Sequence, residues 1–196
     1  MILEYPLSKN KVQALQLGQI VSVSGTVFIG RDEVHMRALE RRHQGKLLPV
    51  DLEDGILYHC GPIMTRDSRG WKVIAAGPTT SARMNKLEPD FIKEFGIRAI
   101  IGKGGMSRPT VEAMKEHGCV YLAFTGGAAV LAAQKITRVR GVEWLDLGMP
   151  EALWIIEADS LGPLTVAIDA HGNSLYDNVE KEVQGNLEAA RLRLGL

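Results

Sequence analysis

Cysteine is scarce in this sequence. The 196 residues include only Cys60 and Cys119, and no CxxC pair. An iron–sulfur cluster or a structural zinc site normally needs three or four ligands, largely thiolates, which two distant cysteines do not supply. The first residues also lack the basic segment and apolar run of a secretory signal. We therefore expect a cytoplasmic protein with reduced thiols that binds no metal by itself.

An excess of either charge is also missing. Lys plus Arg number 23 and Asp plus Glu number 23, whereas a nucleic-acid binder usually carries a basic excess. No stretch approaches the ~20 apolar residues that span a bilayer. The apolar share of 45% and the charged share of 23% are typical of a globular protein. We expect one domain over residues 1–196, with neither nucleic acid nor membrane as a partner.

Patterns of strand and helix alternate through the middle of the chain. They predict strands at residues 19–29, 71–76, 98–101, 119–124, 152–157 and 164–168, and helices at 32–43, 89–95, 107–117 and 126–136. Asp32 is expected to cap the first helix. The last twenty residues predict an amphipathic helix with Val179, Val183, Leu187 and Leu194 on one face. This order indicates α/β layering with a partly parallel, mixed sheet.

Four short stretches place polar residues beside glycines where predicted strands end. They are GRDEVH from Gly30, GPTTSAR from Gly77, GKGGM from Gly102 and FTGGA from Phe124. In open α/β sheets, ligands bind beyond the carboxyl ends of the strands, where such loops gather. These loops are therefore candidates for a small-anion site.

Each stretch taken alone has a structural alternative. Arg83 follows Thr79 by four residues, so one helical turn can bring a guanidinium, which suits a carboxylate, beside a hydroxyl. The alternative is a turn capped by Thr79, Thr80 or Ser81 and a surface arginine. Lys103 lies between glycines that permit close approach to an anion, or it is an exposed lysine in a turn. The loop lacks the spacing of a Walker motif.

The remaining polar residues are less informative. Arg31 either faces a ligand or pairs with an adjacent carboxylate, and we interpret His35 as a structural, half-buried histidine. His59 and Cys60 are neighbours, so on a strand their side chains point to opposite faces and do not form a catalytic pair. The other histidines have no metal-ligand spacing.

Taken in order, six segments resemble the C-terminal domain, or separate β subunit, of class I (iron–sulfur) fumarases and of their relatives the L(+)-tartrate dehydratases. The segments are GRDEVH, HCGPIM, AAGPTTSARM, IGKGGMS, YLAFTGGAAVLAA and LDLGMPEALWIIEAD. The resemblance covers nearly the whole chain and implies an α/β fold of the swivelling β/β/α type, a mixed sheet with a helical layer.

The resemblance also implies a hydro-lyase that interconverts (S)-malate and fumarate plus water. A cluster-bearing α subunit would hold a [4Fe–4S] cluster whose open iron acts as a Lewis acid, and two copies of each subunit would assemble (α2β2). Trp144, Trp154 and the run Leu145–Ile156 are candidates for the partner-facing surface, although core packing is the favoured role for most of them.

Carried over residue by residue, the family's substrate-binding arginines fall on Arg31 and Arg83, and its active-site lysine falls on Lys103. Its proposed catalytic threonine falls on Thr79, with Thr80 as the adjacent alternative. The cations would hold the substrate carboxylates and stabilise the charge that builds up on one of them. Thr79 is then the candidate base.

Two alternatives stay open. The first is an L(+)-tartrate dehydratase β subunit, which converts tartrate to oxaloacetate plus water, because the same residues recognise the shared dicarboxylate. We favour fumarase for its broader metabolic role in the tricarboxylic acid cycle. The second is a non-catalytic small-anion-binding module of the same fold. The presence of Arg31, Thr79, Arg83 and Lys103 together argues against it.

Overall fold

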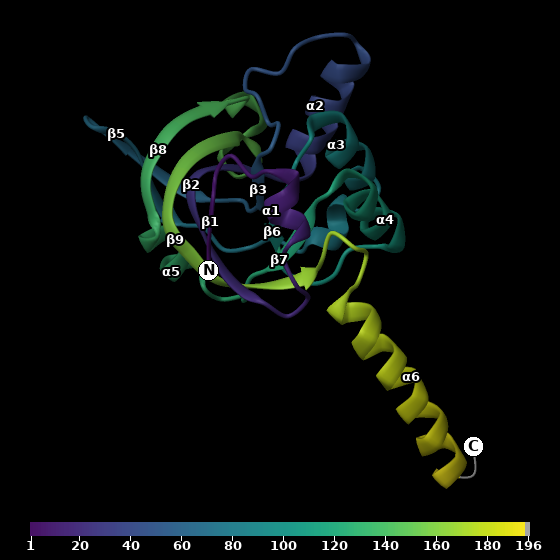
Figure 1. Ribbon diagram of the computed structural model, residues 1–196. Helices are drawn as coiled ribbons and strands as arrows, with labels where there is room; N and C mark the ends of the chain where they lie inside the picture. The colour runs from purple at the N-terminus through teal and green to yellow at the C-terminus, as the bar shows by residue number, and fades with distance from the viewer. Residues whose placement is uncertain (195–196) are drawn as a thin grey trace.

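The computed structural model describes residues 1–194, and at its centre is a curled mixed sheet (Figure 1). Within those residues the sheet has seven strands in the order β1-β2-β3-β6-β7-β9-β8. Their bounds are β1 Ile2–Glu4, β2 Ile20–Gly30, β3 Ile56–His59, β6 Ala99–Gly102, β7 Val120–Ala123, β8 Ile136–Glu143 and β9 Leu153–Ile168. Because β9 also pairs with β2, strands β2, β3, β6, β7 and β9 form a closed ring.

Strand direction places four strand ends at one edge of this ring. β2, β3, β6 and β7 pair in parallel, with Gly30 opposite His59 and Gly102 opposite Ala123. β9 runs antiparallel to β2, β7 and β8. A separate hairpin of β4 Ile63–Asp67 and β5 Gly70–Ala75 extends away from the ring (Figure 1). The loops that leave the four parallel strands therefore start side by side.

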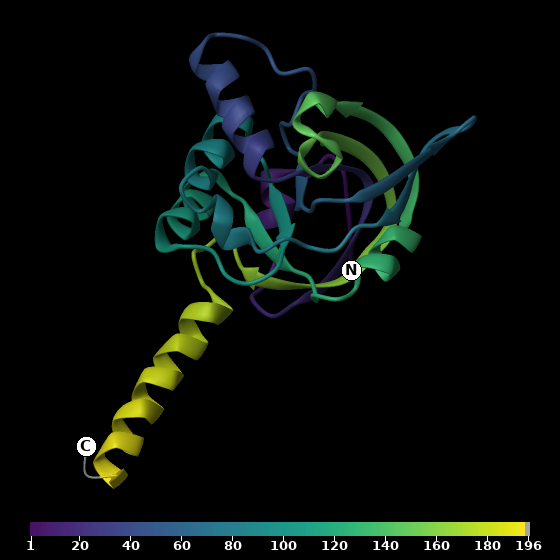
Figure 2. The same cartoon turned by 180° about the vertical axis from the view of Figure 1, so that it is seen from behind.

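Three helices cover one face of the parallel strands, as both views show (Figures 1 and 2). They are α2 Asp32–His43, α3 Glu88–Phe95 and α4 Arg108–His117. Both α3 and α4 carry a proline in the first turn and end at a left-handed glycine, Gly96 and Gly118, as is usual for helix ends. The shorter helices are α1 Lys9–Gln13, α5 Ala129–Gln134, η1 Ser81–Met84, η2 Leu145–Leu147 and η3 Met149–Glu151.

The parallel strands are buried on both faces. In β3, Leu57 packs in the cluster beneath the helices, whereas Ile56 and Tyr58 belong to the cluster on the opposite face. The fully buried Trp154 on β9 belongs to the same cluster as Ile56 and Tyr58, and its ring lies 5.1 Å from that of Trp71 on β5. The expected core role of Trp154 is thus confirmed, as is the mixed sheet with a helical layer.

Some expected element bounds are corrected. The strands expected at 152–157 and 164–168 are parts of the single long strand β9, because pairing with β2, β7 and β8 keeps the intervening segment extended. The helix expected at 126–136 is shortened to α5. Asp32 is not the cap of α2 but its first residue, and Arg31 occupies the cap position without a side-chain cap bond.

The C-terminal helix α6, Leu175–Leu194, extends away from the body of the molecule (Figures 1 and 2). Its expected apolar face is not packed against this chain, since Val179, Val183 and Leu187 are 58%, 51% and 42% exposed. Among the described residues, no helix combines the length and the apolar character needed to cross a membrane.

Candidate functional site

The polar loops expected from the sequence converge at the carboxyl edge of the parallel strands. Arg31 follows β2 directly, Gly61 lies just beyond β3 and Lys103 follows β6. The segment of Thr79 and Arg83 reaches the same edge, because Thr79 N–H donates to the His59 carbonyl over 2.7 Å. All four residues carried over from the resemblance therefore come from loops at one edge of the sheet.

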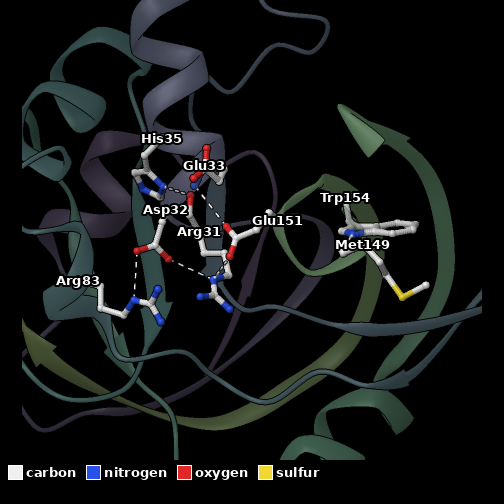
Figure 3. A network of polar contacts seen from close by, with 8 residues as sticks. All are labelled: Arg31, Asp32, Glu33, His35, Arg83, Met149, Glu151 and Trp154. Carbon is white, nitrogen blue, oxygen red and sulfur yellow. Dashed lines mark hydrogen bonds and ion pairs between the residues drawn. The ribbon is translucent and has the colours of Figure 1, made fainter. Parts of the chain in front are cut away.

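Arg31 and Arg83 share a carboxylate (Figure 3). Asp32 lies with one oxygen 3.1 Å from Arg31 Nε and the other 3.1 Å from Arg83 Nε. Glu151 on η3 adds a second contact to Arg31 Nε at 2.8 Å. Burial raises the pKa of Asp32, but hydrogen bonds from its own backbone N–H and from Arg31, with the charge of Arg83, outweigh burial and lower it. Asp32 is therefore a carboxylate that holds both arginines.

Both guanidinium groups are held by Nε, which leaves the paired terminal nitrogens available. Within residues 1–194, the side-chain hydrogen bonds of Arg31 and Arg83 are donated by Nε, and none is donated by an Nη atom. Figure 3 shows the two groups on the same side of the network. Arg31 is 17% exposed and Arg83 53% exposed. Two pre-oriented guanidinium forks are suited to binding carboxylate groups in a bidentate manner.

Thr79 and Lys103 lie on two segments joined by main-chain contacts. Lys103 N–H donates to the Thr79 carbonyl over 3.3 Å, and Ser81 N–H donates to the Lys103 carbonyl over 3.0 Å. Thr80 forms a parallel bridge with Lys103. Thr80 occupies the cap position of η1 without a side-chain bond, so its hydroxyl is not used for capping. These contacts fix the two loops relative to each other.

Gly102 makes the junction between these loops feasible. A Cβ at this position would overlap the Ser81 hydroxyl and lie 3.0 Å from the Tyr121 hydroxyl. Only glycine allows the backbone to pass so close to another loop. The glycines beside Lys103 were predicted to permit the close approach of an anion, but the close neighbour of Gly102 is Ser81.

Two features of the site were not expected from the sequence. Glu151, which binds Arg31, lies far from it along the chain, and no local pattern links the two. His35 is fully buried rather than half-buried, and it groups with the equally buried His59 and Glu88 beneath the loops. This group of three is a potential metal-ligand set by residue type, which its spacing in the sequence did not reveal.

The two cysteines do not provide a cluster site. Both are free and buried, and burial raises the pKa of both thiols, which disfavours the thiolate form. The whole sequence has no third cysteine. The residues of this chain therefore do not fit a cluster that takes three thiolate ligands.

Comparisons with known proteins identify relatives that match most of this chain. The family described as Fumarase C-terminus matches residues 1–179. The putative L(+)-tartrate dehydratase subunit beta of Methanocaldococcus jannaschii is 46% identical over 182 residues, which cover 92% of this chain and 93% of that protein. The L(+)-tartrate dehydratase subunit beta of Escherichia coli K12 is 37% identical over 180 residues, or 92% and 88%.

A third relative has a different chain organisation. The putative fumarate hydratase class I of Geobacillus stearothermophilus is 44% identical over 180 residues, which cover 91% of this chain but 34% of that protein. This chain thus corresponds to most of a separate subunit in two relatives and to about a third of a longer chain in the other.

The Gly102→Ala substitution tests the close packing of the site loops. We expect it to lower the free energy of unfolding by about 1–3 kcal/mol, because the added methyl overlaps the buried Ser81. Urea unfolding followed by circular dichroism measures the change. Gly141→Ala is the matched control: its Cβ meets Ile155 at 3.7 Å, an ordinary contact. Equal stability of the two variants would contradict the packing argument.

Proposed function

Because this chain belongs to the Fumarase C-terminus family, we propose that it is the β subunit of a two-subunit [4Fe–4S] hydro-lyase interconverting (S)-malate and fumarate plus water. The names of two relatives as subunit beta support a partner chain. The buried cysteines support placing the cluster in that partner, a cluster-bearing α subunit. We also propose an α2β2 assembly in the cytoplasm.

The observation that carries this proposal is the pair of guanidinium forks of Arg31 and Arg83. Malate and fumarate each carry two carboxylates, and a guanidinium recognises a carboxylate by two parallel hydrogen bonds. Asp32 holds both side chains through Nε, so little conformational entropy is lost when the substrate binds. The proposed role of both arginines is to bind and orient the dicarboxylate.

Thr79 and Lys103 are proposed to act on the proton beside one carboxylate. That C–H bond is weakly acidic, and its cleavage places negative charge on the adjacent carboxylate. The Lys103 ammonium, on the loop joined to Thr79, would stabilise this charge. The same cationic surroundings favour an ionised threonine hydroxyl, so Thr79 is the candidate base. The leaving hydroxyl would be bound by the partner subunit, at the surface where the two chains join.

The second candidate is an L(+)-tartrate dehydratase β subunit. Two relatives with that name favour it. Both are separate subunits, and the residues that match this chain cover 93% of one and 88% of the other. Tartrate has one hydroxyl more than malate, and its carboxylates need the same two arginines. The substrate therefore depends on what surrounds the extra hydroxyl.

Anaerobic reconstitution of this chain with its cluster-bearing partner tests the proposal. We expect hydration or dehydration activity only when both chains are present, with malate and fumarate preferred over L-tartrate. Each chain assayed alone is the control, and light scattering of the complex gives its stoichiometry. A preference for tartrate would select the second candidate. No activity on any of the three, with an intact cluster and a formed complex, would contradict the hydro-lyase proposal.

Thr79→Ala and Thr80→Ala together identify the base. We expect Thr79→Ala to lower kcat by about 100-fold or more in the reconstituted complex, in the range usual for removal of a general base. Thr80→Ala should leave kcat close to that of the wild type. The opposite order would transfer the role to Thr80, and near-normal turnover in both variants would exclude a threonine base.

Arg83→Lys tests carboxylate recognition by a fork rather than by charge. Lysine keeps the charge but loses the paired nitrogens and the contact of Nε with Asp32. We expect KM for the dicarboxylate to rise by about 10- to 100-fold. Arg69→Lys, at an 89% exposed arginine between β4 and β5, is the matched control. An unchanged KM for Arg83→Lys would remove Arg83 from the binding site.

A further inference from the structure

Three buried titratable residues meet beneath the loops of the candidate site. His35 on α2, His59 at the end of β3 and Glu88 at the start of α3 are each 0% exposed. Nε2 of His35 lies 3.2 Å, and Nε2 of His59 lies 3.1 Å, from the same oxygen of Glu88. One carboxylate oxygen is thus shared by two imidazoles in a fully buried environment.

The other nitrogen of each ring points outward to the site loops. His35 Nδ1 lies 2.8 Å from the main-chain carbonyl of Arg31. His59 Nδ1 lies 2.9 Å from the hydroxyl of Ser81, whose Oγ also accepts from Tyr121 over 2.9 Å. The buried group therefore connects the Arg31 loop with the turn that carries Arg83.

The contacts determine which nitrogens of His35 carry protons. A carbonyl only accepts hydrogen bonds, so Nδ1 facing Arg31 must be protonated. An unprotonated Nε2 would direct its lone pair at the negatively charged Glu88 carboxylate, which is unfavourable in a fully buried site. Both nitrogens therefore carry a proton, and His35 is an imidazolium paired with Glu88.

The same reasoning makes His59 neutral. Ser81 is fully buried and its Oγ accepts the Tyr121 proton, so among the hydrogen bonds of residues 1–194 the acceptor left for its own hydroxyl proton is His59 Nδ1. The single ring proton of His59 is then on Nε2, toward Glu88. One positive imidazole, one neutral imidazole and one carboxylate leave the group without net charge, as a buried cluster requires.

The expected pKa directions agree with this assignment. Burial lowers the pKa of His35, but the Glu88 charge outweighs it and the pKa is raised. Burial lowers the pKa of His59 more than Glu88 raises it. Burial raises the pKa of Glu88, but the two histidines outweigh it and lower it to about 2. The charge of Asp32 also raises the pKa of both histidines, by less than Glu88 does. The Glu88 charge in turn adds to the rise that burial gives to the pKa of the neighbouring Cys119 and Tyr121.

Such a cluster is not an efficient way to stabilise a fold. The Nε2 atoms of His35 and His59 are close enough to Glu88 for hydrogen bonds, but the angles of these contacts are unfavourable. Neither Nε2 atom and neither Glu88 oxygen therefore has a well-aligned hydrogen bond. Apolar side chains of similar size often stabilise a core as well as a buried ion pair does. The distinctive property of this cluster is therefore its fixed set of directional contacts to two loops.

We propose that His35, Glu88 and His59 are positioning residues that set the Arg31 loop relative to the Ser81–Arg83 turn, so that both guanidinium forks face the same dicarboxylate. This inference rests on the proposed function of the site. His35 holds the Arg31 carbonyl by a hydrogen bond. His59 contacts the Ser81 hydroxyl, and the Ser81 N–H donates to the Lys103 carbonyl, so the Lys103 loop is held as well. None of the three touches the substrate.

The protonation states are tested first, by nitrogen-15 NMR of the full chain labelled at histidine. We expect one imidazole protonated at both nitrogens well above the usual pKa of histidine, and one neutral imidazole protonated at Nε2. His35→Gln and His59→Gln assign the two signals. Two neutral rings would overturn the proposal. So would signals of metal-bound imidazole together with one divalent metal ion per chain, because the cluster would then be a metal site.

Positioning is tested with two variants at His35 in the reconstituted complex. The amide of His35→Asn is placed to replace Nδ1 at the Arg31 carbonyl while losing Glu88, whereas His35→Gln reaches Glu88 and loses the carbonyl. We expect similar losses of Tm, but a KM increase of about five- to tenfold in His35→Gln alone. The exposed His43→Gln is the control for changing a histidine.

Failure of the proposed function and failure of the positioning role give different results. An inactive wild-type complex contradicts the proposed function, whereas an active complex with equal KM in both His35 variants contradicts the positioning role. The Arg31 Nε–H resonance, which its contacts with Asp32 and Glu151 shift, gives a readout without activity. It should move in His35→Gln and not in His35→Asn. If neither variant folds, the nitrogen-15 spectrum of the wild type decides. An imidazole protonated at both nitrogens supports the proposal, and the absence of such an imidazole overturns it.

Discussion

The double pairing of β9 is the constraint on which the rest of the molecule depends. It pairs with β2 from Trp154 to Thr165 and with β8 from Leu153 to Ala158, and its last residues, from Thr165 to Ile168, pair with β7. These pairings bring the first and last of four parallel strands back together in a ring. Since β2, β3, β6 and β7 all run in the same direction, their carboxyl ends are held around one rim. Without β9, β2 and β7 would lie apart, and the loops that follow the four strands would be spread along the edge of an open sheet.

The rim also accounts for the chemistry of the loops. Arg31, Arg83 and Lys103 bring three positive charges to one edge, and like charges at this density repel each other. Asp32 and Glu151 reduce this repulsion while binding only Nε of the arginines. The carboxylates therefore orient the guanidinium groups without occupying the nitrogens that a ligand would use. One net positive charge remains for an anionic ligand among these five residues, which is consistent with a dicarboxylate site completed by a second chain.

Local patterns in the sequence predicted much of this arrangement. The alternation at 19–29, the helix at 32–43 and the glycine after 107–117 correspond to β2, α2 and the end of α4, because these features depend on neighbouring residues. The convergence of the Arg31 and Lys103 loops was also predictable, since parallel strands share a carboxyl edge. The Thr79 segment follows β5 of the separate hairpin, and it reaches that edge through main-chain bonds to His59 and Lys103. The closure by β9 was not, because its pairing joins Gly25 with Ala158 and has no local signal.

The part of the site missed by the sequence has the same explanation. Glu151 contacts Arg31, and Glu88 contacts His35 and His59, only after β9 and α3 have been placed by packing. A histidine on an apolar helix face predicts burial at most, and its charge depends on which groups face both ring nitrogens. For His35 those groups are a carbonyl and a carboxylate, and for His59 they are a hydroxyl and the same carboxylate. Two identical side chains therefore take different charges because the fold gives them different partners.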